Sequence, residues 1–299
     1  MPSSRAEAVT GLLARCTFPS PGTAVVVAVS GGADSSALLV LATEAGCEVT
    51  AVHVDHRLRP GSATEADVVA ALAERFGARF VGRTAAVAPG PNLEARARDA
   101  RRAVLPAGAM TGHTVDDQAE TVLVNLLRGA GLDGLAGMRS GPTKPMLRLR
   151  RAETRALCAS LDIVPVEDPM NADLRLRRNR VRHEVLPLLD EVAERDVAPL
   201  LARGAALLAD DAGLLDDLSA ALDPTDARGL AAAPLPLARR AVRRWLAAEA
   251  AAHPPDGATV ARVLTVARGQ WRSTEVGDGR RVARTAGRLR LERPGPSRP

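Results

Sequence analysis

The sequence predicts an α/β fold, with a doubly wound, mostly parallel sheet followed by a second, mainly helical C-terminal domain. Residues 23–29, TAVVVAV, form a continuous apolar, β-branched run, the pattern of a strand covered on both faces. Strand and helix patterns then alternate to about residue 128, as in a sheet whose strands are joined by helices. Beyond Leu188 the chain changes to Ala/Leu/Arg-rich helical periods. We therefore expect two domains, residues 1–190 and 191–299.

The composition is that of a soluble globular protein. At 299 residues, 46% hydrophobic and 25% charged, the chain is long enough to bury a large core. No stretch approaches the roughly 18 to 20 apolar residues of a membrane-spanning helix, and residues 1–20 lack the apolar core of a secretory signal. We expect a cytoplasmic protein with no membrane partner. The cysteines at 16, 47 and 158 form no CxxC pair and are interpreted as packing residues.

The charge balance is basic, with a net charge of +5 and a pI near 10.2, and Lys144 is the only lysine. This permits a nucleic-acid partner bound through its phosphates. A biased genome explains the arginine content equally well. Aromatic residues make up only 2% of the chain, which argues against a surface that stacks several bases on aromatic rings.

The expected elements of the first domain alternate in type. The expected strands cover residues 23–29 and 49–54, with weaker ones at 79–81 and 109–111, and the expected helices cover 35–45, 64–76, 93–105 and 115–128. In the second domain we expect helices at 197–218 and 237–251, and short strands within 280–293 around a turn at Ala286 and Gly287. Ligands bind at the carboxyl ends of parallel strands. The segments that begin at Ser30, His53 and Gly112 all lie just after predicted strands.

The segment SGGADS, Ser30 to Ser35, has the properties of a phosphate-binding loop. Its glycine pair lets backbone N–H groups approach phosphate oxygens, and the next helix presents its positive N-terminal dipole. Ser30, Ser35 and Ser36 add hydroxyl donors, and Asp34 fits if Mg²⁺ lies between it and a phosphate. The loop has no lysine, unlike the Walker loop. The alternative is a small-residue turn with a helix cap; the preceding buried strand favours a loop that helps split ATP into AMP and pyrophosphate.

SGGADS resembles the SGGxDS loop of the N-type ATP pyrophosphatases, the PP-loop superfamily, which has a Rossmann-like sheet. Further segments follow in the order seen in tRNA(Ile)-lysidine synthetases, and the resemblance covers residues from about 23 to 190: AVHVDHRLRPGS at 51–62, NLEARARDARR at 92–102, GHTVDDQAETVLVNLLRG at 112–129 and EDPMNADLRLRRNRVRHEVLP at 167–187. The chain departs from the family at Arg101-Arg102, where Arg-Tyr is usual. Many members also carry a further small C-terminal domain that we do not expect here.

The resemblance implies a ligase that joins L-lysine to C2 of the wobble cytidine of tRNA(Ile) with a CAU anticodon. The reaction uses ATP and Mg²⁺, passes through an adenylated tRNA and releases AMP and pyrophosphate. Residues 1–190 would form the catalytic domain and 191–299 a tRNA-binding domain. A homodimer is left open. Two other functions remain: another PP-loop tRNA-modifying enzyme, such as a 2-thiolation enzyme, which would need cysteines for sulfur, and a non-catalytic RNA-binding module.

The resemblance also assigns candidate residues. The nucleotide-binding candidates are Ser30, Gly31, Gly32, Ala33, Asp34, Ser35, Ser36, His53, His56, Gly112 and His113. Asp34 is expected to bind Mg²⁺ and to act in catalysis. The alternative interpretation of His53 is a structural histidine in the core, because it lies within an apolar alternation.

The helix that begins near Val115 carries the expected lysine-binding carboxylates. Glu120 lies at the border of its apolar stripe, where a carboxylate can be half-buried and still meet a lysine ammonium or take its proton. Asp117 is a second catalytic candidate, although the first-turn acids and Thr114 are also typical of a helix cap. Arg128 is expected to offset phosphate charge. The densest basic cluster supplies the tRNA-binding candidates Arg175, Arg178, Asn179 and Arg182, for which a solvated charged face is the alternative.

Overall fold

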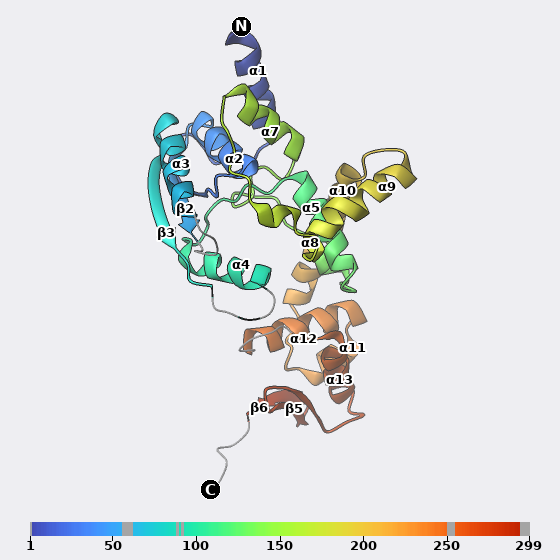
Figure 1. Ribbon diagram of the computed structural model, residues 1–299. Helices are drawn as coiled ribbons and strands as arrows, with labels where there is room; N and C mark the ends of the chain where they lie inside the picture. Colours follow the sequence, from blue (N-terminus) through green and yellow to red (C-terminus); the bar gives the residue numbers. More distant parts are fainter. Residues whose placement is uncertain (1, 56–61, 88–89, 91–92, 250–254, 294–299) are drawn as a thin grey trace. The chain divides into compact units, whose positions relative to one another are not determined.

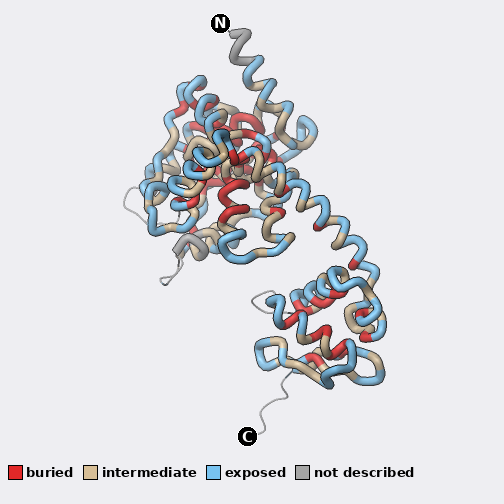
Figure 2. Tube along the Cα trace, turned by 90° about the vertical axis from the view of Figure 1, so that its right-hand side faces the viewer, coloured by how far each residue is buried: buried red, intermediate tan, exposed pale blue. Residues whose placement is uncertain are grey.

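A computed structural model describes residues 2–55, 62–87, 90, 93–249 and 255–293 of the chain (Figure 1). The chain divides into two compact units, Met1–Ala209 and Asp210–Pro299. Buried residues gather inside each unit (Figure 2). The division into a catalytic domain, residues 1–190, and a tRNA-binding domain, residues 191–299, stays a prediction.

The first unit is built on a parallel sheet of β1 (Ala24–Ala28), β2 (Glu48–Asp55) and β3 (Arg79–Thr84), in the order β1-β2-β3. On the other side of β1, Met110 forms an isolated parallel bridge with Val27. The chain therefore builds the sheet outward from β1 and then returns to the opposite side of β1. That reversal creates a topological switch point, where open α/β sheets bind ligands.

The expected parallel α/β sheet is confirmed, but the strand expected at residues 109–111 is reduced to the bridge at Met110. The Met110 N–H donates to the Val26 carbonyl at 2.7 Å, and its carbonyl accepts from Ala28 N–H at 2.9 Å. Gly108 and Gly112 lie on either side, and glycine weakens a strand. The pairing therefore lasts for one residue.

The rest of the first unit is helical, and several of its helices are not predicted by the sequence patterns, among them the first helix and the one after residue 150. In chain order the helices are α1 (Pro2–Leu13), α2 (Ala33–Glu44), α3 (Ser62–Arg75), α4 (Leu93–Val104), α5 (Val115–Leu126), α6 (Leu132–Leu135), α7 (Arg151–Ser160), the 3₁₀ helix η1 (Pro169–Ala172), α8 (Arg177–Arg180), the π-helical η2 (Val181–Val185), α9 (Leu186–Ala193) and α10 (Ala198–Ala220), which runs into the second unit.

Helix α2 is the central element of the core. Leu38, Leu39 and Leu41 are fully buried, and the helix contacts both the sheet and α7. Because it is covered on more than one side, its buried residues run consecutively instead of forming one stripe. This packing fixes the N-terminus of α2 at the carboxyl end of β1, where the switch point lies.

The second unit combines helices with an antiparallel sheet, so "mainly helical" is incomplete for this part of the chain. Its further elements are α11 (Ala227–Ala232), α12 (Leu235–Glu249), α13 (Gly257–Ala267), β4 (Ser273–Gly277), β5 (Arg280–Thr285) and β6 (Arg288–Glu292), with the strand order β4-β5-β6. The expected turn joins β5 to β6, with φ of 49° at Ala286 and 75° at Gly287, as a tight hairpin requires. β4 is not among the expected strands. No helix in the described ranges is long and apolar enough to cross a membrane.

Candidate active site

The loop after β1 has the backbone geometry expected of SGGADS. Gly31 has a φ of +87°, in the left-handed region that favours glycine. Its carbonyl accepts from Val166 N–H at 3.0 Å, and a Cβ at this position would lie 2.9 Å from Cγ2 of Val166. A larger residue would therefore be strained in conformation and would clash. Gly32 follows as the residue that precedes α2, and Ala33 is the first residue of the helix.

The serine hydroxyls of the loop bond to the loop itself. Ser30 N–H donates to Ser35 Oγ at 3.1 Å, and Ser35 Oγ donates to the Gly32 carbonyl at 2.9 Å. Ser36 is buried and its Oγ donates to the Gly31 carbonyl at 3.3 Å. These bonds hold the loop around the N-terminus of α2. Phosphate binding by the hydroxyls stays a prediction.

Gly112 lies against the first turn of α2. A Cβ on Gly112 would be 2.6 Å from the carbonyl oxygen of Asp34, so only glycine allows this approach. The next residue, His113, contacts Thr111 Oγ1 through Nδ1 at 2.8 Å. Burial lowers the pKa of His113 to about 4, so its ring is neutral near pH 7. The fold thus joins two of the predicted motifs at the switch point.

His53 is a core residue at the end of the sheet. It is 3% exposed, and its Nδ1 lies 2.9 Å from the carbonyl oxygen of Val29. Because a carbonyl oxygen can only accept a hydrogen bond, Nδ1 must carry a hydrogen in this contact. Nε2 is the ring nitrogen that this contact does not use. His56 lies outside the described residues.

Asp117, in the first turn of α5, has two roles in the structure. Its Oδ2 accepts from the N–H and Oγ1 of Thr114 at 2.9 and 3.0 Å, which forms a helix cap, the alternative interpretation of this residue. Its Oδ1 lies 3.0 Å from Nη2 of Arg151 and 3.2 Å from Nη2 of Arg178. Burial alone would raise its pKa, but the two guanidinium groups, together with His113 and the bond from Thr114 N–H, lower it overall.

Arg151 joins the phosphate loop to the acids of α5. Its Nη1 lies 3.0 Å from Glu120 Oε1, and its Nε lies 3.4 Å from Asp34 Oδ2. Thr154 Oγ1 donates to the other oxygen of Asp34. Burial raises the pKa of Asp34; the bonds from Thr154 and Arg151 oppose this rise, and the negative charge of Asp117 adds to it.

Glu120 is fully buried and receives three guanidinium groups. In addition to Arg151, Arg178 Nε lies 2.7 Å from Oε2, and Arg182 lies 2.7 Å from Oε1 through Nε. A buried carboxylate is costly unless it is paired and hydrogen-bonded, and these contacts meet that requirement. The helical pattern predicts a half-buried Glu120 at the border of the apolar stripe; in the structure it lies deeper, inside an arginine cage.

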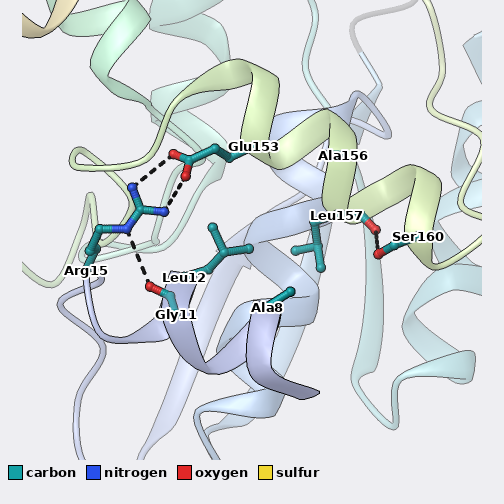
Figure 3. A pocket seen from close by; sticks show the side chains of 8 residues that line it. All are labelled: Ala8, Gly11, Leu12, Arg15, Glu153, Ala156, Leu157 and Ser160. Atoms are coloured by element: carbon teal, nitrogen blue, oxygen red, sulfur yellow. Dashed lines mark hydrogen bonds and ion pairs between the residues drawn. The ribbon is translucent and has the colours of Figure 1, made fainter. Parts of the chain in front are cut away.

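The start of α7 is held by a second set of ion pairs. Asp116 accepts from Arg151 N–H at 2.8 Å and from Nη2 of Arg150 at 2.9 Å. Glu153 accepts from Arg150 N–H at 2.8 Å and forms a two-pronged ion pair with Arg15, beside a pocket between α1 and α7 (Figure 3). These contacts fix the backbone from which the Arg151 side chain extends. Arg150, which precedes α7, and Arg151, which begins it, could not be identified from the sequence, because nothing distinguishes them locally from the many arginines of this chain, and the same holds for Thr154.

The four residues expected to bind tRNA lie in different environments in the structure. Arg178 and Arg182 point inward to Glu120. Asn179 is buried, and its amide donates to the carbonyls of Met170 and Asp173 at 2.7 and 3.0 Å, so it stabilises the local fold. Arg175 is 91% exposed and pairs with Asp173. Only Arg175 among these four candidates thus projects into solvent.

Arg128 is not among the three arginines that contact Glu120. It is exposed and follows the end of α5, two residues after Leu126. Its proposed role in offsetting phosphate charge stays a prediction.

The chain resembles known proteins over most of its length. Residues 6–189 match a family model described as a PP-loop domain. The chain is 43% identical over 311 aligned residues to a protein named tRNA(Ile)-lysidine synthase from Nocardia farcinica, covering 96% of this chain and 97% of that protein. A protein of the same name from Rhodococcus erythropolis is 44% identical over 244 residues, with 76% and 74% of the two chains covered.

Among solved structures, the U34-tRNA thiolase NcsA from Methanococcus maripaludis, determined with its 4Fe-4S cluster, has a TM-score of 0.55 to this chain. The sequence identity is 17%, and the match covers 69% of this chain and 79% of that chain. At this identity the likeness concerns the fold alone.

Proposed function

The chain belongs to the tRNA(Ile)-lysidine synthase family, whose PP-loop domain it carries, and we propose that it joins L-lysine to C2 of the wobble cytidine in tRNA(Ile) with a CAU anticodon. The family is one of ATP-using ligases. ATP would be split into AMP and pyrophosphate.

The observation that carries the proposal is the pair of contacts made by Arg151. One guanidinium group lies 3.4 Å from Asp34 of the phosphate loop and 3.0 Å from Glu120 of α5. The candidate ATP site and the candidate amine site are therefore adjacent. A reaction that first adenylates O2 of a cytidine and then attacks C2, the carbon bonded to that oxygen, with an amine needs this arrangement, because the two reacting atoms are neighbours.

At the ATP end, the N-terminal amides of α2 would bind the departing pyrophosphate. The first N–H groups of a helix have no partner within it, and Gly32 has no side chain to cap them. Gly112 closely approaches the backbone of Asp34 and Ser35 in the first turn of α2, so the segment from Gly112 also lies at this end of the helix. Amides held in fixed positions stabilise charge that develops on the leaving oxygen.

Asp34 fits a role in holding Mg²⁺. One oxygen accepts from Thr154, and the other makes a 3.4 Å contact with Arg151, which leaves lone pairs for a cation. Within the described part of the chain, no group of three or more His, Cys, Asp or Glu residues could hold a metal. Mg²⁺ commonly uses one or two carboxylates together with substrate phosphates, so Asp34 and ATP would suffice. When bound, the ion would neutralise phosphate charge.

At the amine end, we propose that Glu120 and Asp117 bind the L-lysine substrate. Their carboxylates meet three arginines, and an incoming ammonium would compete with those groups for the same oxygens. Because its neighbours lower the pKa of Asp117, this carboxylate stays ionised at neutral pH. It suits the binding of an ammonium better than the removal of its proton.

The proposed reaction has two steps, and in each step one bond forms and one bond breaks. The O2 atom of the cytidine attacks the α-phosphate of ATP and expels pyrophosphate. The bound ε-ammonium of lysine loses a proton to solvent, the neutral amine attacks C2, AMP leaves with O2, and the attacking nitrogen releases a second proton to solvent. The side chains of Glu120 and Asp117 would orient the amine.

A 2-thiolation activity receives less support. Burial raises the pKa of Cys16 and of Cys158 to about 11, so both are protonated at neutral pH and are poor nucleophiles. All three cysteines are free. We further propose that the enzyme acts in the cytoplasm, where tRNA is available, and that a homodimer is one assembly to test.

The test is to measure AMP and pyrophosphate released from ATP with the CAU tRNA and L-lysine each present or omitted, followed by mass analysis of the tRNA. A lysine-dependent mass gain at the wobble cytidine is expected. AMP release that needs tRNA but ignores lysine would point to another PP-loop modification. No ATP turnover under any condition would favour a non-catalytic RNA-binding protein.

A further inference from the structure

Thr154 is a buried polar side chain on the face of α7 that meets the phosphate loop. It is 1% exposed, and the nearby helix residues Leu157 and Cys158 belong to the apolar core of the first unit. A hydroxyl in such surroundings is costly unless it is hydrogen-bonded. The proposed function gives Thr154 no role of its own, so the partners of its hydroxyl decide what it does there.

The Thr154 hydroxyl lies between two acceptors. Its Oγ1 is 2.9 Å from the carbonyl oxygen of Arg151, three residues earlier in the same helix, and it also contacts Oδ1 of Asp34 in α2. A hydroxyl has one hydrogen, so it can donate to only one of these oxygens at a time. Threonine commonly bonds to a carbonyl of its own helix, but a bond to an ionised carboxylate is stronger. An ionised Asp34 therefore takes the hydrogen.

Three contacts join α7 to the first turn of α2. Arg151 Nε lies 3.4 Å from Asp34 Oδ2, and Thr154 bonds to Oδ1 of the same carboxylate. Cys158 Sγ lies 3.5 Å from the carbonyl oxygen of Ala33. Residues 151, 154 and 158 are three and four positions apart, so they share one face of α7. Helix packing therefore sets the place of the hydroxyl relative to Asp34.

The two donors at Asp34 determine how its carboxylate is turned. Thr154 reaches one oxygen and Arg151 the other. The Arg151 contact, at 3.4 Å, is long for a hydrogen bond, so Thr154 contributes most of the orientation. Each carboxylate oxygen has two lone pairs, so both oxygens can still meet a cation. Donors of this kind orient metal-binding carboxylates, and their loss typically costs roughly 10- to 100-fold in metal affinity or activity.

We propose that Thr154 is a positioning residue, whose hydroxyl orients the Asp34 carboxylate for the Mg²⁺ that accompanies ATP. This inference rests on the proposed function, which assigns Mg²⁺ and ATP to Asp34. Thr154 acts through Asp34 and not by contact with a substrate. The alternative is a structural hydroxyl that only bonds to the Arg151 carbonyl. The two roles differ in one measurable respect, because only a positioning role changes the affinity for the metal.

The experiment compares the full-length variants Thr154→Val and Thr154→Ser with the matched control Thr43→Val. Valine keeps the shape of threonine but has no hydroxyl, whereas serine keeps the hydroxyl. Thr43 also bonds to a carbonyl three residues earlier in its helix, that of Val40, at 2.8 Å. It lies in the last turn of α2, at the opposite end of the helix from the phosphate loop. Thr43→Val therefore controls for the loss of such a bond.

Two measurements separate an effect on the metal from an effect on the loop. Binding of Mn²⁺, a paramagnetic probe for the Mg²⁺ site, is followed by electron paramagnetic resonance in the presence of ATP. ATP affinity is measured by calorimetric titration, once with Mg²⁺ and once in EDTA. Thr154→Val is expected to need roughly 10- to 100-fold more Mn²⁺ for half-saturation than wild type, and to lose ATP affinity only when Mg²⁺ is present. Thr154→Ser should retain most of the affinity, and Thr43→Val should match wild type.

Equal Mn²⁺ requirements in Thr154→Val and Thr43→Val would overturn the inference. A loss of ATP affinity that is the same with Mg²⁺ and in EDTA would also overturn it, because that result indicates a deformed loop. Urea unfolding checks that each variant folds. If Thr154→Val does not fold, Thr154→Ala also removes the hydroxyl and must show the same rise in the Mn²⁺ requirement.

The failure of this inference can be told apart from the failure of the proposed function. Wild-type protein that binds no ATP in the presence of Mg²⁺ would refute the proposed function itself. Wild-type protein that binds ATP and Mn²⁺, with Thr154→Val binding both equally well, would refute only the role of Thr154.

Discussion

The guanidinium group of Arg151 and the carboxylate of Glu120 meet at 3.0 Å in the interior of the first unit, with the glutamate fully buried. Arg151 belongs to α7 and Glu120 to α5. The same arginine reaches Asp34 of α2 at 3.4 Å. One side chain therefore ties together three helices that carry the candidate chemistry, so the stability of the fold and the proposed binding of substrate involve the same ion pairs.

Replacing Glu120 by glutamine should cost about 3 to 5 kcal/mol of stability, because three guanidinium groups would lose their buried partner. Urea unfolding measures this loss. The variant should still adenylate tRNA, but it should need more lysine. The matched control is Glu184→Gln, since Glu184 is an exposed acid that pairs locally with Arg180, and its loss should cost no more than about 0.5 kcal/mol. An unchanged lysine requirement in Glu120→Gln would leave Glu120 a purely structural acid.

Asp34→Ala should abolish AMP formation and leave tRNA binding nearly intact. Asp34 lies at the start of α2, beside the phosphate loop, and the proposed Mg²⁺ would be held there. AMP release and filter binding of tRNA give the two readouts. Asp67→Ala, at an exposed position on α3, serves as the control and should behave as wild type. Wild-type turnover by Asp34→Ala would remove Asp34 from the mechanism.

Gly112→Ala should lower ATP affinity about tenfold and destabilise the protein by about 1 to 3 kcal/mol. The added methyl group would lie 2.6 Å from the Asp34 carbonyl oxygen, so the first turn of α2 must shift. Calorimetric titration with ATP tests the first effect. For comparison, Gly204→Ala adds a methyl group with nothing within 4 Å inside α10, and it should stabilise the helix slightly. Equal ATP affinity in both variants would contradict the close approach described for Gly112.

Stability should fall as the pH is lowered from about 6.5 towards 4, in part because of His113. Burial lowers the folded-state pKa of His113 to about 4, whereas an unfolded histidine has a pKa near 6.5. Between these values the unfolded state binds more protons, so stability is present above the higher pKa and is lost as pH falls. From pH 7 to pH 5 this one group should account for a loss of about 2 kcal/mol.

The variant His113→Asn isolates this contribution, since asparagine does not titrate in this range. Urea unfolding at pH 7 and pH 5 should give a smaller difference for the variant than for wild type, by about 2 kcal/mol. Identical pH dependence in the two proteins would mean that His113 is not buried in its neutral form.

The parts of the fold that could be predicted were those with strong local patterns. The run at 23–29 and the helix after it became β1 and α2, and the Ala286-Gly287 turn became the β5–β6 hairpin. β4 ends at Gly277 and is short, so it left no periodic signal. The strand expected at 109–111 depended on its tertiary partner, β1, and of this segment only Met110 pairs with β1.

Residues of the candidate site could be predicted from the sequence where their role follows from the local backbone conformation. Gly31 and Gly112 could be identified because a glycine directly after a buried strand is typical of a backbone that must turn or approach another segment closely. Arg151 could not be identified from the sequence, because its partners Asp34 and Glu120 lie 117 and 31 residues away in the chain. The inward direction of Arg178 and Arg182 depends on how α8 and η2 pack on α5, which sequence spacing alone does not determine.

The single lysine of the chain has a practical consequence. Amine-selective reagents modify deprotonated amines, and Lys144, whose pKa is lowered, and the terminal amine are the only primary amines in the sequence. Acylation of this protein would thus report almost entirely on one side chain beside the switch point. An enzyme whose proposed substrate is itself an amine would then carry a nearly unique covalent reporter, and protection of Lys144 by RNA or nucleotide could be read by peptide mass alone.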